Sequence, residues 1–138
     1  GIRVPFIVKW SGVVKPGSVS HDPVTSVDVF PTIVELAGVK LPKNHVVDGV
    51  SLVPHFRSSG KESLGRDAIY WHFPHYRHAP GPYSIIRDGD FKLIKFYAGP
   101  GYELYDLEND LGEKNNLADR MPDKVKSLQA KMQHVLEN

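Results

Sequence analysis

The chain has 138 residues, of which 41% are hydrophobic and 24% charged, a composition typical of one globular domain or part of a larger one. Its 17 Lys and Arg residues nearly balance 16 Asp and Glu residues, so the net charge does not indicate a nucleic-acid or membrane-surface partner. The absence of cysteine excludes disulfides, thiolate metal sites and cysteine nucleophiles, and no apolar run approaches membrane-spanning length.

One strand and one helix are predicted near the start of the chain. Residues 6–8 form a nearly continuous apolar run, which is typical of a strand buried on both faces of a sheet. Few other runs could pair with it, so we expect its partners to be missing. Residues 25–37 predict a helix, because cap-forming residues precede an apolar face with helical spacing. Pro31 is expected in its first turn and Gly38 at its end.

A long loop is predicted over residues 40–66. Its polar stretch 57–61 is the best candidate for a boundary between two domains. These domains are predicted to be residues 1–60 and residues 61–138.

The second domain is predicted to contain a small antiparallel sheet. An aromatic strand is expected at 68–73, a hairpin over 83–97 and a further strand at 102–107. Asp88-Gly89 is expected to form the hairpin turn, since Gly accepts the positive φ that other residues resist.

The chain is predicted to end in an amphipathic helix that packs on this sheet. Pro122 suits its first turn, and Asp119 is a candidate cap. The helix and sheet together predict an α+β unit that could bury a modest core. The apolar face of the helix consists of Val125, Leu128, Met132 and Val135, with Leu136 beside it.

The cluster His72, His75, Arg77 and His78 is the most conspicuous candidate site. A metal site is disfavoured, because Pro74 prevents a helix that would place the histidines on one face and no carboxylate orients the rings. A second interpretation is the rim of a polyanion or glycan site, since Arg can bind sulfate or carboxylate and aromatic rings stack on sugars. The remaining alternative is a solvated loop beside a strand.

Other clusters are weaker candidates for chemistry. His21-Asp22 is interpreted as a capped turn. An acidic stretch from Asp106 to Glu113 lacks the pattern of an EF-hand loop, so a solvated turn is favoured over a calcium site. The sequence has no Gly-x-Ser-x-Gly elbow, phosphate loop or His-Glu-x-x-His helix, so no catalytic and no metal-binding residue is predicted.

Several stretches resemble type I sulfatases of the alkaline phosphatase superfamily. Together these stretches cover nearly the whole chain. Each stretch alone is weak evidence for the family, but their order and spacing make the series specific for it. The stretches are GIRVPFIVKW at 1–10, VDVFPTIVELAG at 27–38, DGVSL at 48–52, RDGDFKL at 87–93 and ELYDL at 103–107.

The resemblance implies the C-terminal portion of a sulfatase, with a fold between α/β and α+β. Residues 1–60 would form the back edge of the large α/β domain, and residues 61–138 the C-terminal subdomain beside the active-site cleft. The full-length protein, here called the parent, would hydrolyse sulfate esters of carbohydrates or aryl compounds. It would use a calcium ion and a formylglycine residue. None of the residues for these groups has a match here, so this chain alone is expected to be inactive and to need the missing N-terminal part.

The resemblance also implies that His72, His75, Arg77 and His78 contact the substrate. We expect the parent to be periplasmic or secreted, with any targeting signal upstream of Gly1. The apolar faces of residues 6–8 and of the helix at Phe30, Ile33 and Val34 would lack the segments that cover them in the whole protein. They are expected to be exposed, disordered or paired with another copy. Two alternatives stay open: the tail of a related phosphodiesterase or phosphonate hydrolase, and a non-catalytic module that binds glycans or proteins.

Overall fold

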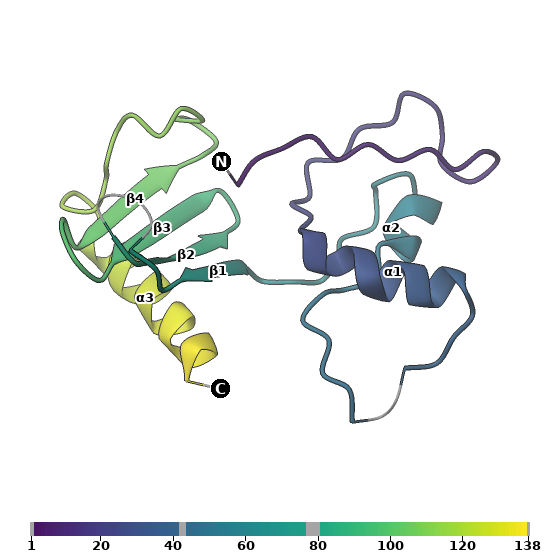
Figure 1. The fold of residues 1–138 in the computed structure, drawn as a ribbon. Coiled ribbons are helices and arrows are strands. Elements are labelled where there is room, and N and C mark those ends of the chain that lie inside the picture. Colours follow the sequence, from purple (N-terminus) through teal and green to yellow (C-terminus); the bar gives the residue numbers. More distant parts are fainter. Residues whose placement is uncertain (1, 42–43, 77–80, 138) are drawn as a thin grey trace. The chain divides into compact units, whose positions relative to one another are not determined.

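The computed structural model describes residues 2–41, 44–76 and 81–137. The chain divides into two compact units, Gly1–Arg66 and Asp67–Asn138, and each is considered by itself (Figure 1). The assignment of residues 1–60 and 61–138 to two regions of a sulfatase stays a prediction.

The predicted strand at residues 6–8 is wrong, because the described residues 2–10 have no regular secondary structure. The described residues of Gly1–Arg66 form no strand, so this apolar run has no strand to pair with inside its own unit. Phe6 and Ile7 are instead 50% and 90% exposed. The expected exposure of this apolar run is therefore confirmed.

The helix predicted at 25–37 is confirmed as the short 3-10 helix η1 (Ser26–Asp28) followed by α1 (Val29–Leu36). Gly38 adopts a φ of +66°, which lets the backbone turn back on the helix end. The Val39 and Gly38 N–H groups donate to carbonyls of the last turn, at 3.1 and 3.0 Å. The apolar residues Val27, Val29, Phe30, Ile33 and Leu36 are all exposed.

A second helix, α2 (Val53–Arg57), lies within the stretch predicted to be a loop, and that prediction is wrong here. Five residues are too few to produce a helical hydrophobic period in the sequence. Leu52 and Val53 at its start are each only 1% exposed, so the short helix is held by burial rather than by its intrinsic propensity.

The second unit has the predicted antiparallel sheet with a helix on it. Its strands are β1 (Ile69–Phe73), β2 (Tyr83–Asp88), β3 (Phe91–Phe96) and β4 (Tyr102–Asp106), in the order β1-β2-β3-β4. Asp88 pairs with Phe91, so the hairpin turn consists of Gly89 and Asp90, one residue later than predicted. Gly89 has a φ of +57°, which is the conformation for which a turn favours glycine.

Helix α3 (Pro122–Leu136) lies across one face of this sheet (Figure 1). Its cap is Met121 rather than the predicted Asp119, because the Val125 N–H donates to the Met121 carbonyl. Asp119 lies inside a preceding turn that Arg120 and Met121 close by donating to the Leu117 carbonyl.

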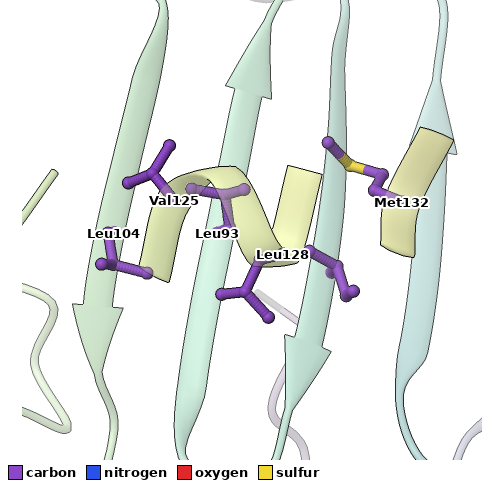
Figure 2. Packing of buried hydrophobic residues seen from close by; sticks show 6 residues of the cluster. Leu93, Leu104, Val125, Leu128 and Met132 are labelled. Atoms are coloured by element: carbon purple, nitrogen blue, oxygen red, sulfur yellow. The ribbon is translucent and has the colours of Figure 1, made fainter. Parts of the chain in front are cut away.

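The core of the second unit forms between α3 and the sheet (Figure 2). The predicted apolar face is confirmed for its first three members, while Val135 and Leu136 are 44% and 39% exposed. The helix therefore covers the sheet with its first three turns. The buried cluster consists of Ile86, Leu93 and Leu104 from the strands and Val125, Leu128 and Met132 from the helix.

Candidate functional site at the end of strand β1

The candidate site is built on a row of directly paired residues across three strands. His72 on β1 pairs with Ser84 on β2, and Ser84 pairs with Lys95 on β3. Directly paired residues share one face of a sheet, and residues two apart on a strand share it as well. Because Tyr70 and Ile86 pair on the α3 face, His72 and Ser84 lie on that face too, one row beyond the core.

A chain of hydrogen bonds joins His72 to Tyr97 through Ser84. The Ser84 hydroxyl lies 2.7 Å from His72 Nδ1 and 2.8 Å from the Tyr97 hydroxyl. Ser84 is 1% exposed, whereas Tyr97 is 45% exposed and His72 is also exposed. The serine is therefore a buried connector between two side chains that reach the surface.

The same cluster includes a cation. Lys95 Nζ lies 5.1 Å from the centre of the Tyr97 ring, and the His72 ring meets that ring edge-on at 6.0 Å. Tyr97 thus contacts both the lysine and the histidine, which places a charged group beside an imidazole on one surface. We name this group, His72, Ser84, Lys95 and Tyr97, the β1-end cluster.

His75 belongs to a different set of rings. It packs edge-on against Phe73 with centroids 5.1 Å apart, and Phe73 stacks on Tyr83 at 5.4 Å. Phe73 follows His72 directly on β1, so its side chain lies on the opposite face of the sheet. His72 and His75, the two histidines of the predicted rim that the structure describes, are therefore not brought together, and each contacts its own aromatic partner. Arg77 and His78, the other two predicted rim residues, lie outside the described residues.

Ser84, Lys95 and Tyr97 were not predicted from the sequence to belong to a site. The only signal that could have found them is strand register, since Ser84 and Lys95 are eleven residues apart and become neighbours across the hairpin. A hairpin turn displaced by one residue alters every such pairing.

The carboxylates of the acidic stretch accept hydrogen bonds from nearby backbone N–H groups. The Asn115 and Lys114 N–H groups, at 2.7 and 2.8 Å from Asp110 Oδ2, lower the pKa of the Asp110 carboxyl. The side-chain amide of Asn109, 2.8 Å from Asp106 Oδ2, lowers the pKa of Asp106. Among the described residues no group of three or more His, Cys, Asp or Glu side chains could hold a metal ion.

The first unit contains a buried carboxylate that joins three segments. Asp28 is fully buried, and its carboxylate accepts hydrogen bonds from the Thr25 N–H, the Val50 N–H and Arg66 Nη2 at 2.8, 3.0 and 2.7 Å. Thr32 adds a second link by accepting from the Leu52 N–H at 2.9 Å. These contacts attach the DGVSL loop to α1 and indicate a structural role.

His55 is buried in the same unit and also has a structural role. Its Nε2 lies 2.9 Å from Ser20 Oγ, and its Nδ1 lies 2.5 Å from the Glu62 carbonyl oxygen. The Asp22 carboxylate is 3.9 Å from Nδ1, while the Asp22 N–H donates to Ser20 Oγ at 3.2 Å. The Ser20 hydroxyl thus caps the backbone at Asp22, while the Asp22 carboxylate lies near His55.

Known proteins with related sequences and folds are sulfatases and a related hydrolase. A sulfatase from Formosa agariphila is 39% identical over 88% of this chain and 24% of its own length. A structure described as a complex with its substrate D-glucosamine-2-N,6-O-disulfate superposes with a TM-score of 0.76, at 32% identity over 91% of this chain and 26% of its own. The phosphonate monoester hydrolase of Silicibacter pomeroyi gives 0.69, at 27% identity over 91% of this chain and 27% of its own.

The chain spans about a quarter of the length of these relatives. The family model for the C-terminal region of N-sulphoglucosamine sulphohydrolase matches residues 1–138, which is the whole chain. The resemblance to sulfatases and the mixed α/β architecture predicted from the sequence are both confirmed. The chain therefore belongs to the sulfatase family, as a C-terminal portion of the N-sulphoglucosamine sulphohydrolase type.

Proposed function

We propose that the whole protein is a sulfuric ester hydrolase that acts on a sulfated carbohydrate, and that this chain forms its C-terminal portion. The observation that carries the proposal is the match of an N-sulphoglucosamine sulphohydrolase model to residues 1–138. The relative solved with D-glucosamine-2-N,6-O-disulfate supports the same substrate class. We therefore propose sulfated glucosamine as the first substrate to test.

The proposed role of this chain is to supply scaffold and substrate contacts rather than the reacting groups. His72, His75, Arg77 and His78 are the proposed contacts. Its sequence contains no C/S-x-P-S-R motif from which a formylglycine could be made, and its described residues offer no fit for a calcium ion. Both groups are assigned to the remainder of the protein. We propose that the chain alone has no sulfatase turnover.

Two alternatives remain from the sequence. The phosphonate monoester hydrolase shows that this architecture also occurs in an enzyme with a different ester specificity. The sulfatase from Formosa agariphila, at 39% identity against 27%, supports the sulfatase proposal over this alternative. A glycan-binding module without catalysis would instead show saturable binding of sulfated oligosaccharides by the isolated chain, and this binding would be lost in His75→Ala or Arg77→Ala. No binding by the isolated chain would favour the sulfatase proposal.

We propose a periplasmic or secreted location for the whole protein, which fractionation with compartment markers would test. The structure, over the residues it describes, contains no helix that is both long and apolar enough to cross a membrane. We further propose that the exposed apolar residues of α1, such as Phe30 and Ile33 at 50% and 58%, allow the isolated chain to self-associate.

The reaction class is tested with the whole purified protein and two matched chromogenic esters, an aryl sulfate and the corresponding aryl phosphonate. We expect turnover of the sulfate ester to exceed that of the phosphonate ester by a large factor, because the sulfatase assignment requires selection for a sulfuryl group. A clear preference for the phosphonate ester would overturn the assignment and favour the phosphonate hydrolase.

A further inference from the structure

We propose that the β1-end cluster is a binding subsite for an anionic oxygen group, a sulfate or a carboxylate, of the carbohydrate substrate. His72, Lys95 and Tyr97 would contact the anion, and Ser84 would hold His72 and Tyr97 in position. The inference rests on the proposed function for the identity of the carbohydrate. The anion subsite itself is inferred from the contacts within the cluster.

The hydrogen-bond chain through Ser84 can run in either of two directions. Ser84 has a single hydroxyl proton and two neighbours, His72 Nδ1 and the Tyr97 hydroxyl. If Tyr97 donates to Ser84, Ser84 donates to Nδ1 and the N–H of His72 is on Nε2, away from the serine. If His72 donates instead, Ser84 donates to Tyr97, whose proton is then free to face outward. Either arrangement leaves one donor for an external acceptor.

Lys95 carries a positive charge beside the hydrogen-bond chain. Three other described lysines contact the sheet: Lys92 pairs with Glu113 at 2.6 Å, Lys131 pairs with Asp88, and Lys124 Nζ lies 4.6 Å from the centre of the Phe91 ring. Within the described parts of the chain, Lys95 has no carboxylate within ion-pair distance, and its ammonium lies near the Tyr97 ring. Its charge is therefore available to an anion from outside.

The side chains of the β1-end cluster are held in place by the sheet and by one another. Ser84 is 1% exposed and sits between two paired strands, so its hydroxyl is fixed by the sheet. The edge-on contact of His72 with Tyr97 restrains both rings. A positioned imidazole, a phenol and an ammonium group on one surface match the acceptor oxygens of a sulfate or carboxylate, because charge-assisted hydrogen bonds are the strong ones.

The test follows the His72 imidazole by NMR in the whole protein labelled with ¹⁵N-histidine, with the resonance assigned by its loss in His72→Gln. Sodium sulfate and sodium glucuronate are titrated separately against sodium chloride at equal ionic strength. We expect a saturable shift of the His72 resonance with at least one of the two anions. The more effective probe identifies the sulfate or the carboxylate as the group bound.

Two variants and one control make the test specific. Lys95→Met and Tyr97→Phe should each raise the apparent dissociation constant roughly tenfold, the size of one charged hydrogen bond. Lys126→Met removes the same charge from the surface of α3, where Lys126 is 78% exposed, and should leave the constant unchanged. No saturable shift with either anion, or an equal loss in Lys126→Met, would overturn the subsite.

The subsite and the proposed function fail separately. Turnover of an aryl sulfate without a shift of the His72 resonance would contradict the proposed subsite and support the sulfatase proposal. A saturable shift of the His72 resonance in a whole protein that hydrolyses no sulfate ester would support the subsite and contradict the proposed sulfatase activity.

Discussion

The two units of the chain are stabilised by different kinds of contact. In Asp67–Asn138 a helix packs on a sheet, and the six residues of the buried cluster are all apolar. In Gly1–Arg66 the fully buried side chain of Asp28 links three segments, while the apolar side of α1 is exposed. The second unit thus resembles a small domain with its own apolar core, whereas polar contacts link the segments of the first unit.

The largest effect is expected from Asp28→Ala in the first unit. The substitution leaves the Arg66 guanidinium, whose side chain is only 14% exposed, and the Val50 N–H without their acceptor, which should cost about 3–5 kcal/mol of local stability. Hydrogen exchange should show loss of protection in α1 and at residues 50–53, with little change in the β-sheet. Asp123→Ala is the matched control, because the Asp123 side chain is 99% exposed.

If Asp28→Ala destabilised both units equally, the two would form one cooperative unit. The distinction between a polar-linked unit and an apolar-core unit would then lose its basis. Unchanged protection in α1 would equally contradict the structural role of Asp28.

The next largest effect is expected from Leu128→Ala in the second unit. Leu128 is fully buried between α3 and the sheet, so truncation leaves a cavity and should cost about 2–5 kcal/mol in the unfolding free energy. Val135→Ala on the same helix, at 44% exposure, should cost much less. Denaturant unfolding followed by the α3 and sheet signals measures both, and equal losses would contradict the packing in Figure 2.

The smallest effect concerns Tyr105 on the face of the sheet away from the buried cluster. Burial first, and then the hydrogen bond to Glu103, raise the pKa of the Tyr105 phenol to about 12. Because the pKa is higher in the folded state, this contribution to stability is complete below pH 10 and is lost as the pH rises through about 12. Ultraviolet titration should show a late phenolate step that disappears in Tyr105→Phe.

Glu103→Gln sharpens the same measurement. It removes the negative charge that opposes the phenolate, so the late step should move to lower pH while burial keeps it above the ordinary range. An unshifted step would show that Glu103 does not act on Tyr105.

Much of the second unit could be predicted from the sequence, because its signals are local. Alternating strands, a glycine turn and an apolar helical face all act within a few residues, and the sheet and α3 follow from them. The predicted turn was one residue too early, because the sequence shows where a turn can form but not which pair of residues closes it. The structure places the turn at Gly89-Asp90.

The first unit was harder to predict, because tertiary contacts decide its structure. The run at residues 6–8 has the composition of a buried strand, but strand formation depends on a partner. The sequence presents Asp28 as a helix cap, and its carboxylate does receive the Thr25 N–H. Its links to Val50 and Arg66 join residues 22 and 38 positions away, which no local pattern indicates.

The candidate site shows the same limit. His72 and His75 stand out in the sequence, yet they lie in different ring contacts in the structure. The partners of His72 are supplied by strand register, and none of them is adjacent in sequence. For His72 and His75, closeness along the chain therefore did not show which side chains each of them contacts in the structure, and their role as substrate contacts stays a prediction.

The most direct test of the central claim compares sulfate release from D-glucosamine-2-N,6-O-disulfate by the whole protein and by the chain of residues 1–138. We predict that the whole protein releases sulfate and that the chain alone releases none, because the reacting groups are assigned elsewhere. Ion chromatography of free sulfate gives the answer without a coupled reaction. Sulfate release by the chain alone would contradict the account. So would the absence of sulfate release by a whole protein that turns over the chromogenic sulfate ester.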